Sequence, residues 1–125
     1  VPVIKIADSK NIENLAKEIV DLAEKARTRK IDLMDLKGST FTITNYGSIG
    51  GKYATPIING KEAAILGVGK AFDELDVNKA GLWIRRKILP LSLTFDHRIL
   101  DGAEASYFME TLRKYIEDPE ELLLT

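Results

Sequence analysis

Several residue types are scarce in this chain, and each scarcity excludes a class of site or partner. None of the 125 residues is cysteine, which excludes disulfides and thiolate metal sites, and a single histidine excludes sites built from several imidazoles. No apolar run approaches the ~20 residues that span a bilayer, and no signal peptide opens the chain. The 18 basic and 19 acidic side chains give a net charge of −1, which offers no cationic face to nucleic acid or an anionic membrane. These absences predict a soluble, intracellular domain without metal, membrane or nucleic-acid partners.

The residues that are present predict one domain of the α+β class. Hydrophobic residues make up 45% of the chain, which suffices for one core over residues 1–125. The predicted elements are a terminal strand over Val1–Ile6, a helix from Ile12 to Ala26 behind an Asn11 cap, a strand over Thr40–Tyr46, a strand over Ala63–Val68, strand material from Leu82 to Phe95 broken at Pro90, and a helix over Gly102–Glu117 stopped by Pro119. Helices on either side of a run of strands predict a largely antiparallel or mixed sheet flanked by helices.

Two turn regions are predicted between the strands. Asn59-Gly60 lies between the apolar runs Ile57-Ile58 and Ala63–Val68, and this arrangement is a strong hairpin signal. The polar stretch from Asp73 to Gly81 predicts a second turn region.

Each predicted helix has one apolar face that we expect to be buried. The first face comprises Ile12, Leu15, Ala16, Ile19, Leu22, Ala23 and Ala26, and the second comprises Ala105, Phe108, Met109, Leu112 and Ile116. A basic cluster ends the first helix, where cations favour the C-terminal carbonyl groups: Lys25, Arg27, Arg29 and Lys30. We interpret this cluster as a solvated helix end rather than a binding patch.

The single histidine, His97, lies where a sheet commonly carries catalytic groups. It belongs to the segment Asp96–Gly102, directly after an apolar strand and before a helix. An imidazole with an ordinary pKa of ~6.5 is mostly neutral at pH 7 and can accept a proton. The alternative from position alone is a surface histidine without a chemical role.

Asp101 also has two interpretations. It precedes the second helix, and Glu104 follows three residues later, which is the spacing of a capping box. Its place in the same segment as His97 makes it a candidate for catalysis. A cap would also fix the turn that carries the histidine.

Neither glycine cluster predicts a nucleotide site. Gly47 and the run Gly50-Gly51-Lys52 lack the hydroxyl residue and the spacing of a phosphate-binding loop. Gly67-Val68-Gly69 lacks the third glycine of a dinucleotide fingerprint. Tight turns and close backbone packing account better for both clusters.

The segment Asp96–Gly102 resembles the DHRxxDG motif of the dihydrolipoamide acyltransferase components of 2-oxo-acid dehydrogenase complexes, which form one family with chloramphenicol acetyltransferase. Other segments are similar to that family in order and spacing: Val1–Ile19, Gly38–Gly51, Thr55–Asn59, Ala64–Val68 and Leu91–Leu93. The likeness therefore covers the whole chain. One departure lies at Gly60–Ala63, where the family usually has a proline-containing turn.

The resemblance implies the chloramphenicol acetyltransferase-like fold and the C-terminal half of the acyltransferase catalytic domain over residues 1–125. The N-terminal half of that domain, the lipoyl domain and the peripheral-subunit-binding domain are absent from the sequence. A homotrimer that assembles into a larger core is also implied, with decarboxylase and dihydrolipoamide dehydrogenase partners reached through the absent domains. The implied location is the cytoplasm of a bacterium or the mitochondrial matrix of a eukaryote.

The implied activity is acyl transfer between coenzyme A and the dihydrolipoyl group of an absent domain. In this likeness His97 corresponds to the general base, Thr44 to the hydroxyl that stabilises the oxyanion, and Asp101 to a residue that holds the active-site turn through an arginine. Asn45 and Gly69 match positions near the bound coenzyme. Without the resemblance, Thr44 would be an ordinary strand residue, because threonine favours strands.

The implied acyl group is acetyl, with a branched-chain acyl group as the alternative. A second alternative is a structural core subunit without activity, and retention of His97, Asp101 and Thr44 favours the enzyme. We expect the chain by itself to be inactive, because part of the substrate tunnel is missing, and we expect the apolar tail Leu122–Leu124 to need a covering partner.

Overall fold

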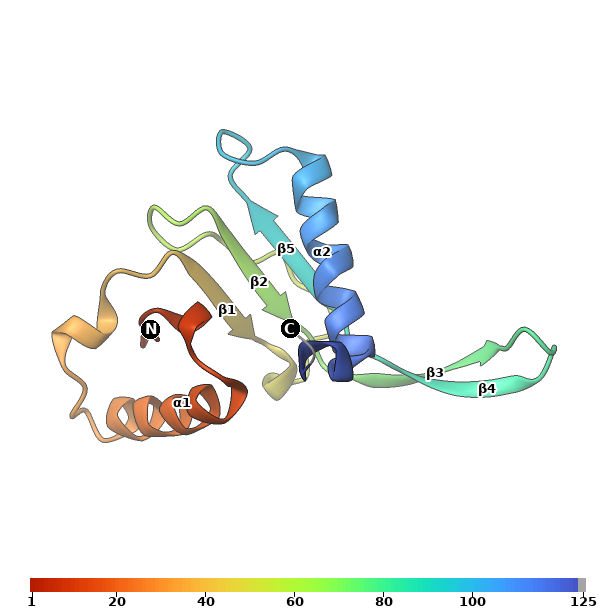
Figure 1. Cartoon of the computed structure of the whole chain (residues 1–125), viewed down its shortest axis with the longest axis horizontal. Coiled ribbons are helices and arrows are strands. Elements are labelled where there is room, and N and C mark those ends of the chain that lie inside the picture. Colours follow the sequence, from red (N-terminus) through yellow and green to blue (C-terminus); the bar gives the residue numbers. More distant parts are fainter. Residues whose placement is uncertain (124–125) are drawn as a thin grey trace. The chain divides into compact units, whose positions relative to one another are not determined.

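A computed structural model describes residues 1–123 and divides into two compact units, residues 1–40 and the part that begins at Phe41. The first unit contains the 3-10 turn η1 (Ala7–Ser9), the helix α1 (Ile12–Arg27) and the 3-10 turn η2 (Leu33–Leu36) (Figure 1). Asn11 caps α1 as predicted, because its side-chain oxygen accepts a hydrogen bond from the backbone N–H of Asn14 at 2.8 Å.

The predicted terminal strand over Val1–Ile6 is wrong. The Val3 N–H donates to the Asp35 carbonyl at 2.7 Å, but no ladder pairs with this segment within residues 1–123. Ile6 has φ 51°, in the left-handed region that an extended chain does not visit. The apolar pattern was present, but a strand also needs a partner and an extended backbone.

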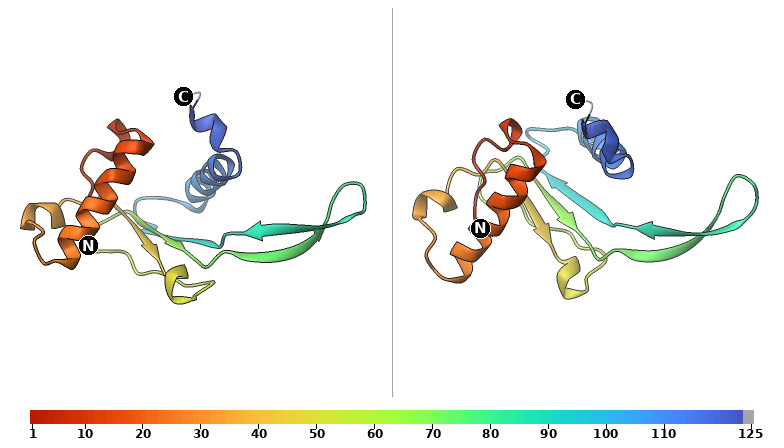
Figure 2. Two further views of the ribbon diagram at one scale, coloured as in Figure 1. Left: turned by 90° about the horizontal axis from the view of Figure 1, so that it is seen from below. Right: turned by 60° about the horizontal axis from the view of Figure 1, so that its bottom comes forward.

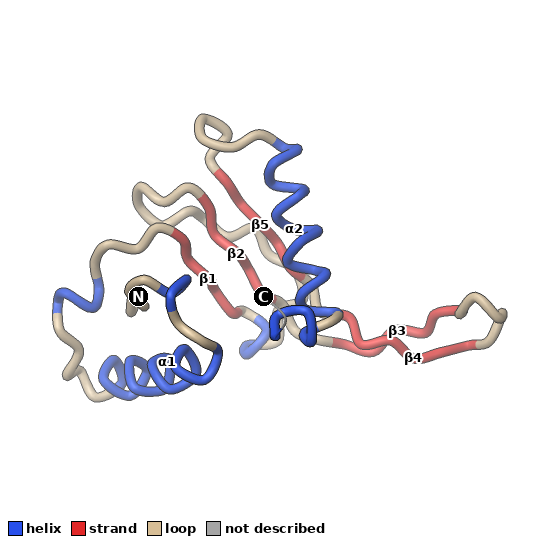
Figure 3. The backbone as a smooth tube through the Cα atoms, in the orientation of Figure 1, coloured by secondary structure: helices blue, strands red, loops and turns tan. Residues whose placement is uncertain are grey.

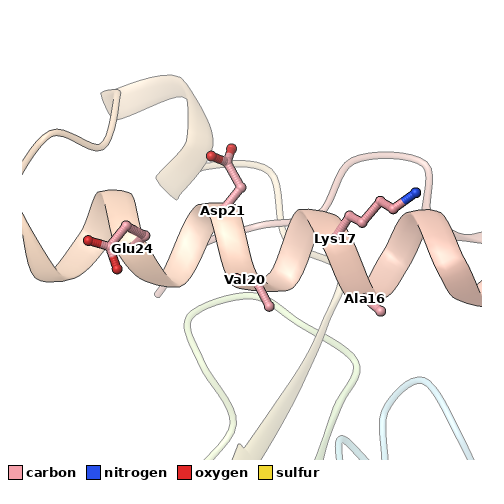
Figure 4. A pocket seen from close by; sticks show the side chains of 5 residues that line it. All are labelled: Ala16, Lys17, Val20, Asp21 and Glu24. Atoms are coloured by element: carbon pink, nitrogen blue, oxygen red, sulfur yellow. The ribbon is translucent and has the colours of Figure 1, made fainter.

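The predicted buried face of α1 is largely exposed. Leu22 is buried, whereas Ile12 and Ile19 keep 62% and 55% of their surface accessible. Figure 4 shows a shallow depression on this helix, lined by Ala16, Lys17, Val20, Asp21 and Glu24. The helical period predicts which side is apolar, but burial also requires a surface that covers it.

The second unit is built on a mixed three-stranded sheet, as the α+β prediction required. The strands β1 (Phe41–Asn45), β2 (Ala64–Val68) and β5 (Leu91–Phe95) lie in the order β1-β2-β5 (Figure 1). β2 is parallel to β1 and antiparallel to β5. The helix α2 (Gly102–Glu117) has the predicted bounds. It lies over one face of this sheet (Figures 1 and 2).

The two faces of the sheet differ in chemistry. The face toward α2 carries Phe41, whose ring centroid lies 5.8 Å from that of Phe108 on the helix. The opposite face, which we name the hydroxyl face, carries Thr42, Thr44, Tyr46, Ser92 and Thr94, because strand side chains alternate and the register aligns these positions. Ala64, Ile65 and Leu66 of the central strand are buried on both sides.

Of the predicted buried face of α2, Ala105 is buried, while Phe108 and Ile116 remain partly exposed.

The strands β3 (Phe72–Val77) and β4 (Trp83–Ile88) form a hairpin that extends away from the sheet (Figure 2). The prediction of a turn region over Asp73–Gly81 is therefore wrong for its first half, because the turn begins only at Asn78. Acidic residues are disfavoured in strands, but those of β3 form ion pairs with basic residues of β4. The Asp76 carboxylate, for example, lies 2.7 Å from the Arg86 guanidinium.

The hairpin predicted around Asn59-Gly60 is also wrong. A turn is present, and Gly60 adopts φ +61°, which suits glycine. However, Ile57 is 88% exposed and unpaired with β2, whose two neighbours are β1 and β5. The described part of the chain ends in the 3-10 turn η4 (Pro119–Leu123). Leu122 is 40% exposed, and Leu124 of the predicted apolar tail lies outside the described residues. No helix within residues 1–123 is long and apolar enough to cross a membrane.

Candidate active site

His97 lies in a tight turn directly after β5. The Asp96 N–H donates to the Ala63 carbonyl at 2.9 Å, and the Asp96 carbonyl accepts from the N–H groups of Ile99 and Leu100 at 2.9 and 3.0 Å. Figure 3 shows this loop between β5 and α2, at the end of the sheet where β1 and β2 begin. The His97 side chain is exposed, and its ring centroid lies 4.8 Å from that of Phe95. The backbone therefore fixes the turn and leaves the imidazole accessible.

Asp96 anchors this turn from within. Its carboxylate accepts hydrogen bonds from the Arg98 N–H at 2.9 Å and from the Arg98 guanidinium at 2.6 to 3.0 Å. Hydrogen bonds from the Arg98 side chain and backbone, aided by the positive charge of Arg98, lower the pKa of Asp96 to about 2. A carboxylate with a lowered pKa stays ionised throughout the neutral range, so the turn keeps its anchor at neutral pH.

Asp101 closes the turn at its other end. Its side-chain oxygen accepts the Glu104 N–H at 2.9 Å, and the Glu104 carboxylate accepts the Asp101 N–H at 3.0 Å. This reciprocal pair is the predicted capping box at the start of α2. The arginine partner expected for Asp101 is not among the ion pairs of residues 1–123, in which Arg98 pairs with Asp96 instead.

Replacing the Asp101 cap is expected to destabilise the protein. Asp101→Ala removes the acceptor for the Glu104 N–H and should lower the free energy of unfolding by ~0.5–2 kcal/mol, whereas Asp101→Asn, an equally good cap, should change it little. Urea unfolding measures both variants. Asp118→Ala, just beyond the other end of α2, is the matched control. A loss in Asp101→Asn as large as that in Asp101→Ala would show that the charge, and not the cap, stabilises the helix.

Thr44 lies near the carboxyl end of β1, on the hydroxyl face. It is half-buried and stands opposite Gly67 of β2, which in turn stands opposite Ser92 of β5. The absence of a side chain at Gly67 leaves a gap in the middle of this row. The Tyr46 ring fills the gap, and its hydroxyl donates to Ser92 Oγ at 3.3 Å.

Within one chain, His97 and Thr44 lie at opposite ends of the sheet. Thr44 is three residues from Phe41, which shares its end of the sheet with Phe95. Three strand residues span about 10 Å and two strand spacings span about 10 Å, so Thr44 and Phe95 are about 14 Å apart. Because His97 lies beyond Phe95, the two side chains of one chain cannot contact the same carbonyl group.

The structure gives Asn45 and Gly69 local roles near Thr44. The Asn45 side-chain oxygen accepts the N–H groups of Gly47 and Ser48 at 3.0 and 3.3 Å, which starts the turn after β1. A Cβ at Gly69 would lie 2.1 Å from the Lys52 carbonyl oxygen, so only glycine fits there. Close backbone packing therefore accounts for this glycine, as the sequence indicated.

Two contacts of this region were not predicted from the sequence. The Arg98–Asp96 pair could be suspected from their spacing, but the Tyr46–Ser92 contact depends on the pairing of both strands with β2. Within the described part of the chain, no three side chains of the metal-binding types gather into a cluster.

Comparisons with known proteins agree on one family. Residues 1–124 match the family model for the catalytic domain of the 2-oxoacid dehydrogenases acyltransferase. The chain is 44% identical over 124 residues to the dihydrolipoyllysine-residue acetyltransferase component of the acetoin cleaving system of Bacillus subtilis, covering 99% of this chain and 31% of that protein. It is 44% identical over 123 residues to the mitochondrial dihydrolipoyllysine-residue succinyltransferase component of the 2-oxoglutarate dehydrogenase complex of Saccharomyces cerevisiae, covering 98% of this chain and 26% of that protein.

Solved structures share the fold. Dihydrolipoamide acetyltransferase (E2P) from Azotobacter vinelandii, studied for the role of a serine, a histidine and an asparagine in its catalytic mechanism, superimposes with a TM-score of 0.90 at 44% identity. The cubic core of the pyruvate dehydrogenase multienzyme complex gives a TM-score of 0.90 at 43% identity. Each match covers 98% of this chain and 50% of the solved chain. The chain thus spans less than a third of the two curated relatives and half of the solved chains.

Proposed function

The chain belongs to the family of 2-oxoacid dehydrogenase acyltransferase catalytic domains, and from this premise we propose that it forms part of an enzyme that transfers an acyl group between a dihydrolipoyl thiol and coenzyme A. The observation that carries the proposal is the His97 turn, which is anchored by Asp96, closed by Asp101 and open to solvent. An accessible imidazole on a fixed backbone suits a group that moves a proton.

The proposed chemistry begins with the thiol. A free thiol has a pKa of ~8.5 and is mostly protonated at neutral pH, so His97 accepts its proton as general base. The thiolate then attacks the thioester carbonyl, and the carbonyl oxygen gains a negative charge. When this intermediate collapses, the other thiol leaves and the His97 imidazolium returns the proton.

The negative oxygen needs a hydrogen-bond donor, and we propose the Thr44 hydroxyl. Since His97 and Thr44 of one chain lie at opposite ends of the sheet, His97 would work with the Thr44 of a neighbouring copy. Each complete site would then lie between two chains of a homotrimer, and the trimers would assemble into a larger core.

The interval between the histidine and the asparagine of the Azotobacter vinelandii enzyme supports the assignments of His97 and Asp101. Its asparagine follows its histidine by four residues, as Asp101 follows His97. Its serine precedes the histidine by an interval one residue shorter than that from Thr44 to His97. A serine and a threonine can each donate one hydrogen bond, and an asparagine and an aspartate are both good helix caps.

We assign the coenzyme A side of the site to the end of the sheet that carries Thr44. Asn45 follows Thr44 on β1, and Gly69 follows β2 at the same end. Asn45 and Gly69 are proposed to lie beside the bound coenzyme. We propose that this chain is the C-terminal half of the catalytic domain. Decarboxylase and dihydrolipoamide dehydrogenase components would be reached through lipoyl and peripheral-subunit-binding domains outside this chain.

A transfer assay with a panel of acyl groups tests the proposed activity. The complete acyltransferase subunit that contains this chain is supplied with dihydrolipoamide and with acetyl-, succinyl- or isobutyryl-coenzyme A, and release of free coenzyme A is followed. We propose acetyl as the preferred group; the curated relatives include both acetyl- and succinyltransferases. Absence of turnover with every acyl group would contradict the enzyme and favour a structural core subunit.

The chain by itself is expected to show little or no transfer and to self-associate. One copy does not bring His97 and Thr44 together, and several large apolar side chains remain exposed, including Ile57, Trp83 and Phe108. Size-exclusion chromatography with light scattering, run beside the transfer assay, measures both properties. An active monomer would contradict the proposal that the site lies between chains.

A further inference from the structure

We infer that Tyr46 is a positioning residue for Thr44, which it holds in place by bridging β1 to β5 across the gap at Gly67. The inference rests on the proposed role of Thr44 as the oxyanion donor. It adds a residue whose side chain acts through Thr44 rather than on the substrate.

The strand register creates the gap that Tyr46 fills. Thr44, Gly67 and Ser92 form one row across the three strands, and the central member has no side chain. Tyr46 directly follows β1, and its contacts with Gly67 and Ser92 place its side chain on the hydroxyl face with Thr44. The ring of Tyr46 therefore reaches the empty position beside Thr44 from the same strand.

Contacts at Gly67 define how closely the ring fits. A Cβ at Gly67 would lie 2.7 Å from Tyr46 Cε1 and 3.3 Å from both the Tyr46 hydroxyl oxygen and Pro56 Cγ. The ring thus lies directly on the Gly67 backbone, and Pro56 lies close to the same position. A side chain at position 67 would displace it.

The Tyr46 hydroxyl completes the bridge. It donates to Ser92 Oγ at 3.3 Å, while the Tyr46 N–H donates to the Val68 carbonyl at 3.1 Å and the Tyr46 carbonyl accepts the Gly51 N–H at 3.1 Å. The backbone bonds tie this residue to β2 and to the following loop. The side chain alone reaches β5.

This bridge matters because β1 has one strand neighbour in the described sheet. β1 pairs with β2 and lies at the edge of the order β1-β2-β5, and Thr44 is next to its last residue. The end of an edge strand moves more readily than a central strand. A donor must lie within about 2.7–3.1 Å of the oxyanion, and a displacement of about 1 Å can cost ~10²-fold in rate.

The test removes the bridge without removing the ring. In the complete acyltransferase subunit, Tyr46→Phe keeps the ring over Gly67 and deletes the hydroxyl, and Ser92→Ala deletes the acceptor. Each change should lower kcat about tenfold with KM changed less than twofold, and the double variant should lose no more than either single variant. Tyr107→Phe, an exposed tyrosine on α2, is the matched control and should be unchanged.

A second background separates this inference from the proposed function. In Thr44→Val the donor is already absent, so adding Tyr46→Phe should cause no further loss of kcat. An equal tenfold loss in that background would overturn the inference and leave the role of Thr44 intact. If Thr44→Val itself keeps normal kcat, the proposed oxyanion role fails.

A measurement on the complete acyltransferase subunit tests the positioning without activity. The methyl NMR signal of Thr44 should shift and broaden in Tyr46→Phe and in Ser92→Ala, and remain in place in Tyr107→Phe. An unchanged Thr44 signal in both bridge variants would overturn the inference.

Discussion

Replacing His97 by alanine in the complete acyltransferase subunit is expected to lower kcat by ~10²–10⁴-fold while the assembly stays intact. We propose the imidazole as the general base for the thiol, and groups in this role contribute a factor of that size. Loss of the side chain should not disturb folding, because His97 is exposed and its turn is held by Asp96 and Asp101. Steady-state transfer assays give kcat, and light scattering gives the size of the assembly.

Arg98→Lys is a matched control for the same turn. A lysine keeps a cation beside Asp96 but gives up the two-pronged contact of the guanidinium, so the pKa of Asp96 should rise from about 2 toward its ordinary value while the protein keeps most of its kcat. A variant of His97 with near-normal turnover would remove the residue from the mechanism.

Replacing Thr44 by valine is expected to lower kcat by ~10²–10³-fold with little change in KM. Valine has nearly the shape of threonine and keeps the strand, but it cannot donate to the oxyanion, which forms only during the reaction. Thr44→Ser retains the donor and should keep most of the activity. Steady-state kinetics of the two variants in the complete subunit make the comparison. An effect of Thr44→Val confined to KM would make Thr44 a binding residue instead.

The second helix and its cap could be predicted from the sequence because their signals are local. The apolar period, the Asp101–Glu104 spacing and Pro119 all lie within one segment, and α2 has the predicted bounds. The same holds for Asn11 at the start of α1. Local hydrogen bonds and helical periodicity need no knowledge of distant partners.

The errors lie where pairing between distant segments decides the structure. β3 carries Asp73, Glu74 and Asp76, a composition typical of a loop, and becomes a strand because β4 supplies cations opposite. Ile57-Ile58 has the composition of a strand, but β1 and β5 pair with β2 instead. Strand propensity is a property of a single residue type, whereas strand pairing depends on which partner strand gives the lower free energy.

The candidate site divides in the same way. His97 and Asp101 could be located from one motif, since both belong to a single turn. The distance between His97 and Thr44 depends on β5 running opposite to β1, which no local pattern reports. The bridge from Tyr46 to Ser92 likewise joins residues brought together only by their separate pairing with β2.

The hairpin that extends from the sheet has a consequence for the order of folding. β2 and β5 are far apart along the chain, so pairing Val68 with Leu91 directly would close a long loop at a large entropic cost. β3 and β4 are joined by a short turn and pair as far back as Phe72 with Ile88. Once the hairpin has formed, only residues 69–71 and 89–90 separate its first pair, Phe72–Ile88, from the Val68–Leu91 pair. Local closure then converts a slow, long-range encounter into a short step, and the central strand gains its second neighbour as an extension of the hairpin.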